Sequence, residues 1–244
     1  MKLGLLTSSM PERSLEEVAT WAGANGYEAL ELAAWPHLGD RPFTASHVKA
    51  DAFDEAEAER VRRALDEHGL VLSALAYYDN NLSPDAAERE AYHAHLRACI
   101  DAAAAFGGVP VGTFIGRDPG RSVAENLREA ERVFPPLVEY AGERGVRLMI
   151  ENCVMEGWHP DGYPGNLAYS PELWEWMFEL GLYLNFDPSH LLWLGIDPID
   201  ALYEGGFEGV LSVEHEDPVW GGSEEKVELG LKIAHRTLRP LVVA

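Results

Sequence analysis

The hydrophobic and polar positions along the chain repeat one local pattern: an amphipathic helical stretch, a glycine, and then a short apolar strand. Glycine suits the residue that follows a helix because it accepts a positive φ, and an apolar strand suits a sheet that helices cover. The glycine–strand phrase occurs at 25–33, 68–76, 107–115, 144–151, 180–187 and 205–216. The amphipathic periodicity predicts helices over roughly 14–25, 54–68, 84–106, 122–144, 170–180 and 223–238.

A further apolar strand, KLGLLT, opens the chain, so that seven predicted strands alternate with helices. This alternation is typical of a parallel α/β protein. The segment after the first strand, LLTSSMPERS, lacks the glycines of a phosphate-binding loop, which disfavours an open dinucleotide-binding sheet. Acidic residues also follow the apolar part of several strands, and in a closed barrel all these strand ends meet at one mouth. We therefore predict a single (β/α)8 TIM barrel domain over residues 1–244.

The spacing of the glycines contains one anomaly. The interval is 39 residues from Gly69 to Gly108, 37 to Gly145 and 36 to Gly181, but only 25 from there to Gly206. One strand–helix unit barely fits into the last interval, and an eight-stranded barrel needs two strands there. The sequence predicts either a seven-stranded barrel or the loss of strand seven and its flanking loop near 201–204, within the interval 196–206.

Composition and charge exclude several classes of protein. Hydrophobic residues make up 47% of the 244 positions and the net charge is −22, a balance that repels nucleic acid because phosphate binding needs clustered Lys and Arg. We find no run of about 18 apolar residues and no basic leader before MKLGLLTSSM, so we expect no membrane span and no signal peptide. Cys99 and Cys153 lie too far apart to suggest a metal knuckle, and a reducing cytoplasm is the predicted location.

Three acidic residues, Glu151, Asp187 and Glu214, each follow an apolar run from a different strand. Carboxylates that face one cavity repel each other, and a divalent cation with hard oxygen ligands resolves the repulsion. The alternative is that each acid caps the helix that follows it. His190 comes three residues after Asp187, so we expect it at the same mouth. The alternative for His190 is a loop histidine bonded to a carbonyl group.

Three phrases carry a family resemblance: IENC at 150–153, NFDPSHLLWLGIDP at 185–198 and SVEHEDP at 212–218. Together they resemble the sugar phosphate isomerase/epimerase family of xylose isomerase-like TIM barrels, which includes ketose 3-epimerases, inosose dehydratases and, more distantly, endonuclease IV. The resemblance extends from KLGLLT to SEEKVELGLKIAHRTL. It implies one divalent metal ion (Mn, Mg, Co or Zn), with Glu151, Asp187 and Glu214 at the matching ligand positions and His190 at a position that contacts substrate.

The metal-binding histidine that the family places on strand seven has no matching phrase in this sequence. Its expected place is the short interval near 201–204, so the family pattern and the glycine spacing agree. We hypothesise that about 40–60 residues, roughly one to one and a half strand–helix units, are absent there.

The implied activity is that of a metal-dependent sugar isomerase or epimerase that moves a proton next to a carbonyl group. Glu151 and Glu214 would exchange the proton through an enediolate, while His190 orients a substrate hydroxyl. Further residues that we expect to line the pocket are Trp35, His37, Tyr77, Trp158 and Glu31, with ordinary loop packing as the alternative. Arg117 and Arg121 form the only nearby basic pair, which favours an unphosphorylated sugar or polyol as the small-molecule substrate.

Three other functions remain open at this stage. An inosose-type dehydratase would use the same fold and metal but eliminate water. An endonuclease of abasic DNA is disfavoured by the net charge of −22. A metal-less, sugar-binding barrel would explain the missing strand-seven histidine. The sequence does not decide between an isomerase and an epimerase. It also does not decide whether the protein forms a homo-oligomer.

Overall fold

The computed structural model describes residues 1–36, 45–193, 195–197, 207–215 and 218–242. The chain forms two compact units, which we call the first unit (Met1–Ala76 with Phe207–Ala244) and the second unit (Tyr77–Gly206). In both units parallel strands alternate with helices, as the repeated sequence pattern predicts.

The first unit contains four parallel strands in the order β7-β1-β2-β3. Its strands are β1 (Lys2–Leu6), β2 (Ala29–Ala33), β3 (Val71–Ala76) and β7 (Val210–Val213). Its α-helices are α1 (Leu15–Ala24), α2 (Glu55–Asp66) and α8 (Glu224–Leu238), and its 3-10 turns are η1 (Thr7–Ser9), η2 (Ala50–Ala52) and η4 (Arg239–Leu241). All five residues of β2 are buried, which places this strand in the core of the unit.

Local sequence signals explain where the helices of the first unit begin. Ser14 caps α1 in a capping box with Glu17, and Asp54 caps α2 by accepting a hydrogen bond from the backbone of Glu57. Arg13, just before α1, forms ion pairs with Glu224 and Glu228 of α8 and so ties the chain's first loop to its last helix.

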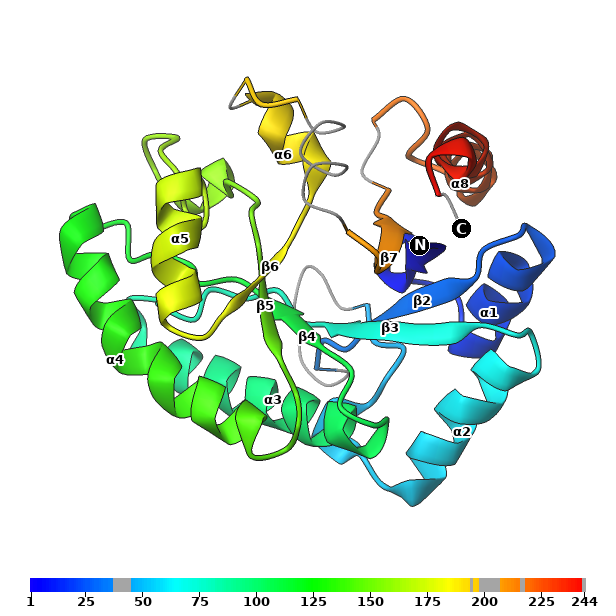
Figure 1. Ribbon diagram of the computed structural model, residues 1–244, viewed down its shortest axis with the longest axis horizontal. Coiled ribbons are helices and arrows are strands. Elements are labelled where there is room, and N and C mark those ends of the chain that lie inside the picture. The colour runs from blue at the N-terminus through cyan, green and yellow to red at the C-terminus, as the bar shows by residue number, and fades with distance from the viewer. Residues whose placement is uncertain (37–44, 194, 198–206, 216–217, 243–244) are drawn as a thin grey trace. The chain divides into compact units, whose positions relative to one another are not determined.

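The second unit contains three parallel strands in the order β4-β5-β6. Its strands are β4 (Val111–Thr113), β5 (Leu148–Glu151) and β6 (Tyr183–Asn185). Its α-helices are α3 (Ala86–Ala105), α4 (Val123–Gly142), α5 (Pro171–Glu179) and α6 (Pro188–Trp193), and η3 (Glu156–Trp158) is a 3-10 turn. The two long helices α3 and α4 lie side by side (Figure 1), joined by the hydrogen bond from Tyr140 to Asp101.

The predicted helices and strands are present, with bounds that shift by a few residues at their ends. The exception is α6, which the sequence pattern did not predict. It begins directly after Asp187, whose carboxylate accepts a hydrogen bond of 2.8 Å from the backbone of Ser189, and Pro188 suits a first helical position.

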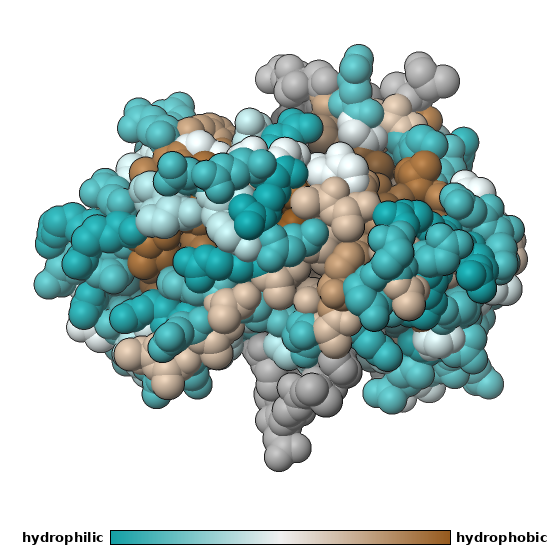
Figure 2. Space-filling model, turned by 90° about the horizontal axis from the view of Figure 1, so that it is seen from below, coloured by the Kyte–Doolittle hydropathy of each residue, from teal (hydrophilic) through white to brown (hydrophobic). Residues whose placement is uncertain are grey.

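Two predictions fall outside the described residues. The interval 198–206, where strand seven is expected to be missing, is not part of the description, and neither is His37. Both therefore stay predictions, as does the single barrel domain over 1–244. Within the described ranges, the helices are too short or too polar to cross a membrane. Hydrophilic side chains cover most of the face viewed in Figure 2, in keeping with the net charge of −22.

Candidate metal centre

The second unit brings together Glu151, Asp187 and His190 at the carboxyl ends of two paired strands. Glu151 is the last residue of β5 and pairs in register with Asn185, the last residue of β6. Asp187 follows β6 after one further residue, and His190 lies in the first turn of α6. The parallel pairing therefore carries both acids to the same end of the sheet, where Glu151 is only 5% exposed.

His190 lies between the two carboxylates. Its Nε2 atom is 3.1 Å from Oδ2 of Asp187 and 3.6 Å from Oε1 of Glu151. Burial opposes a charged ring, but hydrogen bonds to Asp187, Cys153 and Glu151 outweigh burial and raise the pKa of His190 to about 12. Burial likewise opposes the charged form of Asp187, yet the bond from His190 holds the pKa of this carboxyl below its ordinary value. In the metal-free protein these contacts therefore favour the charged ring, which balances the negative charge of the acids.

Asn152 fixes the backbone at Asp187. Its side chain is fully buried, donates a hydrogen bond of 2.9 Å to the carbonyl of Asp187 and accepts one of 2.6 Å from the Asp187 amide. With the bond from Ser189, Asp187 caps α6 and also holds His190. The two alternatives that the sequence left open for Asp187, helix cap and site residue, are thus compatible.

Asn166 fixes the loop that leaves β5. This fully buried side chain donates hydrogen bonds of 2.9 Å to the carbonyl groups of both Glu151 and Cys153, and its Oδ1 accepts a bond of 3.0 Å from the amide of Gly116. The long loop between β5 and α5 is therefore anchored to the end of β5 by its own residue Asn166. Sequence reasoning did not single out Asn166.

Cys153 joins the same cluster. One donor atom from each of Glu151, Cys153 and His190 lies within 4.8 Å of the others, and the same limit holds between carboxylate oxygens of Glu151 and Asp187. Burial raises the pKa of the Cys153 thiol. The sequence signal for Cys153 is its spacing: it lies two residues after Glu151, and side chains at such positions share a face of an extended chain.

These donor atoms fit a divalent metal ion. Protein ligands lie about 2.0–2.3 Å from a zinc ion, so two ligands of one ion are at most about 4.6 Å apart. Carboxylate oxygens of Glu151 and Asp187 lie within 4.8 Å of each other, close to this limit. Carboxylate oxygen, imidazole nitrogen and thiol sulfur are also the donors that such ions take from proteins.

A line of aromatic side chains lies beside this cluster in the second unit. Asn185 donates a hydrogen bond of 2.7 Å to the hydroxyl of Tyr78, whose ring centroid is 5.1 Å from that of Phe114. The ring of Phe114 in turn meets Trp158 edge to face at 5.4 Å. Trp158, a predicted pocket residue, is thus linked to Asn185 beside the metal centre. Tyr78 follows the same predicted strand as Tyr77, whereas sequence reasoning did not single out Phe114.

Tyr77, the neighbouring tyrosine among the predicted pocket residues, packs against a helix. It is fully buried and packs against His95 of α3 with the ring centroids 4.5 Å apart, so it belongs to the layer between sheet and helix. The neighbouring Tyr78 points to Asn185 instead, because adjacent residues of an extended segment face opposite sides. The structure therefore favours Tyr78 over Tyr77 as the residue next to the site. Glycine at position 112 gives this ring room, since a Cβ atom there would lie 2.3 Å from the Tyr78 hydroxyl.

Three predicted residues belong to the first unit. Glu31 is buried inside β2 rather than at its end, Trp35 is a buried residue just after β2, and Glu214 directly follows β7. Their assignment to the site with Glu151 stays a prediction.

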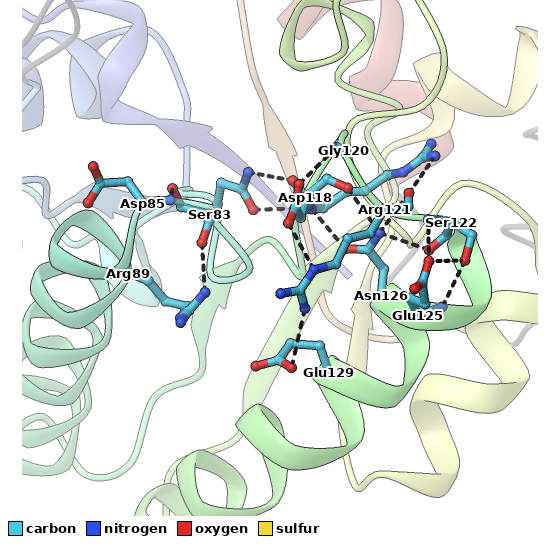
Figure 3. A network of polar contacts seen from close by, with 12 residues as sticks. Ser83, Asp85, Arg89, Asp118, Gly120, Arg121, Ser122, Glu125, Asn126 and Glu129 are labelled. Carbon is cyan, nitrogen blue, oxygen red and sulfur yellow. Dashed lines mark hydrogen bonds and ion pairs between the residues drawn. The ribbon is translucent and has the colours of Figure 1, made fainter.

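The two arginines at 117 and 121 are engaged in the loop between β4 and α4. Arg121 forms ion pairs with Asp118 at 3.2 Å and with Glu129 at 3.7 Å, as Figure 3 shows. Arg117 donates a bond of 2.9 Å to the carbonyl of Pro164. These contacts tie both guanidinium groups to the loop itself.

Parallel strands alternating with helices, with acidic residues at or just after the carboxyl ends of the strands, are the arrangement of a TIM barrel. The family model of the xylose isomerase-like TIM barrel matches residues 19–208. The chain belongs to this family, and the predicted fold class and family are confirmed.

Comparisons with individual proteins agree with this assignment. The chain is 27% identical over 237 residues to the uncharacterized protein YfiH of Bacillus subtilis (strain 168), covering 84% of this chain and 70% of YfiH. A D-psicose 3-epimerase, crystallised in the presence of D-fructose, superposes with a TM-score of 0.72 at 14% identity over 99% of both chains. The probable 3-DHS dehydratase AsbF of Bacillus anthracis superposes with a TM-score of 0.70 at 16% identity, covering 97% of this chain and 99% of AsbF. At these identities the two structures show a common fold.

Proposed function

We propose that the protein is a divalent-metal-dependent isomerase or epimerase that acts on an unphosphorylated sugar or polyol. The observation that carries the proposal is the cluster of Glu151, Asp187 and His190 at the ends of β5 and β6, in a chain of the xylose isomerase-like family. A bound divalent ion would supply Lewis acidity there, drawing charge from a substrate carbonyl and stabilising the enediolate that forms when the neighbouring carbon loses a proton.

Glu151 is the proposed base. Its carboxylate is buried and has two oxygens, so that one can hold the ion while the other takes the proton from the carbon next to the carbonyl. Asp187 is held by Asn152 and Ser189 and is the proposed second metal ligand. The second proton-transfer group and third carboxylate ligand is assigned to Glu214, on the sequence pattern in which it follows β7 as Glu151 ends β5.

His190 is the proposed contact to a substrate hydroxyl. Its side chain lies beside both Asp187 and Glu151, so a ring N–H placed there orients the hydroxyl next to the reacting carbon. The aromatic line of Tyr78, Phe114 and Trp158 supplies an apolar surface for the sugar ring or chain. The arginines at 117 and 121 are occupied by loop contacts, which favours a substrate without phosphate.

The test is exchange of the proton next to the carbonyl with solvent deuterium, followed by NMR. The purified chain is incubated with added Mn²⁺ and, in a parallel series, with added Co²⁺. The substrates are a panel of ketoses that includes D-fructose, D-psicose and L-ribulose, because the names of proteins with this fold mention these sugars. We expect exchange with at least one ketose, and Glu151→Gln to slow it by about 10²–10⁴-fold. Glu179→Gln, at an exposed end of α5, is the matched control. Absence of exchange with every ketose, or exchange that persists in Glu151→Gln, would overturn the proposal.

A second candidate function is a dehydratase, favoured by the structural likeness to the probable 3-DHS dehydratase AsbF. The same base would remove the same proton, but a hydroxyl on the next carbon would leave as water. Loss of water from 3-DHS or a keto-inositol, measured by ultraviolet absorption of the conjugated product, separates this activity from epimerisation.

A further inference from the structure

Cys153 offers a sulfur donor to the same centre. It follows β5 two residues after Glu151, and its thiol hydrogen-bonds with the ring of His190. Its Sγ atom lies within 4.8 Å of a carboxylate oxygen of Glu151 and a ring nitrogen of His190. We propose that Cys153 is a ligand of the metal ion and that it makes the centre selective for a borderline-soft ion, Zn²⁺ or Co²⁺, over Mg²⁺ or Mn²⁺. This inference rests on the proposed function only in assuming that the centre binds metal.

The backbone around Cys153 is held as firmly as that of Glu151. Asn166 donates hydrogen bonds of 2.9 Å to the carbonyl groups of both residues, so one buried side chain fixes the spacing between the two donors. Preorganised donors lose little freedom when an ion binds, which favours ligation by this sulfur over a role as a loosely placed neighbour.

Ligand chemistry gives the selectivity. Carboxylate oxygens suit Mg²⁺ and Mn²⁺, whereas a thiolate favours zinc and similar ions. On binding, the S–H bond breaks, the sulfur keeps the electron pair and forms the bond to the metal, and the proton leaves to solvent. The sulfur of Cys153 then joins the carboxylate oxygen of Glu151 as a donor, and a sulfur among the ligands is typical of zinc rather than of magnesium.

The chain contains a matched control. Cys99 is fully buried in α3, within the same unit but outside the cluster. Cys99→Ser therefore removes a thiol without changing the donor set, whereas Cys153→Ser replaces sulfur by a hydroxyl of similar size at the centre. Circular dichroism and thermal unfolding establish that both variants fold.

The experiment is titration of the metal-free full chain with Co²⁺, followed by near-ultraviolet absorption. We expect a sulfur-to-cobalt charge-transfer band in the wild type and in Cys99→Ser, and its loss in Cys153→Ser. In competition with a chelator, we expect Cys153→Ser to weaken Zn²⁺ binding by at least about tenfold, because even groups that only support a ligand contribute 10–100-fold to metal affinity. The Mn²⁺ affinity should change less than the Zn²⁺ affinity.

The outcomes separate this inference from the proposed function. Binding of Co²⁺ without a charge-transfer band, or equal Zn²⁺ affinity in wild type and Cys153→Ser, overturns the role of Cys153 and leaves the isomerase proposal intact. Binding of none of the four ions by the wild-type chain overturns both. A band that persists in Cys153→Ser but disappears in Cys99→Ser also contradicts the assignment.

Discussion

Nε2 of His190 lies 3.1 Å from Oδ2 of Asp187, three residues earlier in the chain and immediately before the helix that carries the histidine. The contact joins a helix-capping acid to a buried ring, so the same few residues build α6 and the candidate metal centre. It also sets the charge of the histidine in the metal-free protein.

Replacing Asp187 by Asn should lower the pKa of His190 from about 12, because burial opposes the charged ring and Asp187 is the strongest of the groups that offset it. The protonated ring of His190 stabilises the folded chain. This contribution is complete below about pH 6.5, the ordinary pKa of histidine, and is lost as the pH rises through the raised pKa of the folded chain. The measurement is an NMR titration of the histidine ring protons in the metal-free chain. Glu156→Gln removes one negative charge from η3 and serves as the control; an unchanged pKa in Asp187→Asn would contradict the geometry.

Asn166→Ala should destabilise the second unit. The buried carbonyl of Glu151, the half-buried carbonyl of Cys153 and the amide of Gly116 lose their partner. Each loss costs about 1 kcal/mol or more, so we expect about 3 kcal/mol in urea denaturation. Asn166→Asp should be no milder, because a carboxylate cannot donate to the carbonyl groups of Glu151 and Cys153. Asn25→Ala, which removes a single bond at the end of α1, is the control and should cost about 1 kcal/mol or less. An Asp variant with wild-type stability would show that these bonds do not hold the loop.

Gly116→Ala and Gly107→Ala separate backbone strain from a steric clash. Both glycines have positive φ, of 79° and 84°, so alanine at either position costs about 1–2 kcal/mol. A Cβ atom at 107 meets nothing within 4 Å, whereas one at 116 would lie 1.9 Å from Oδ1 of Asn80. Thermal unfolding should therefore show a clearly larger loss for Gly116→Ala, about 3 kcal/mol or more. Equal losses of stability for the two variants would mean that the loop at 116 rearranges to accommodate the added Cβ atom.

Acid should destabilise the first unit through His47. Burial lowers the pKa of this ring, and the nearby Arg60 lowers it further, against the opposing bond to the carbonyl of Arg13. The pKa of His47 is lower in the folded chain than its unfolded value of about 6.5. The free energy that neutral His47 contributes to folding is therefore fully present above about pH 6.5 and is lost as the pH falls through the folded-state pKa. His47→Gln should flatten this part of the stability profile, measured by urea denaturation between pH 7 and about pH 5. A parallel series with His68→Gln, at the end of α2, controls for the loss of a histidine; an unchanged slope in His47→Gln would contradict the prediction.

Hydrophobic periodicity, helix caps and glycines predicted the helices and strands closely, because these signals are local. The capping box of Ser14 and Glu17 and the glycines that follow helices α1 to α5 act within a few residues, so they can be read from the sequence. Helix α6 was not predicted because Asp187, which caps it, directly follows a strand pattern and was interpreted as a strand-end residue. Which of Tyr77 and Tyr78 faces the site depended on the register of one short segment, and a shift of one residue reverses the face.

The sequence by itself determined the alternation of strands and helices, the family, and the acids and histidine at the ends of β5 and β6. Only the tertiary structure decided that Cys153 and Asn166 join the cluster, that His190 lies between two carboxylates, and that Tyr78 is the tyrosine beside it. The physical reason is that helix and strand signals come from neighbours along the chain. A site depends instead on atoms from β5, α6 and the loops between them, whose separations are set by strand pairing and packing.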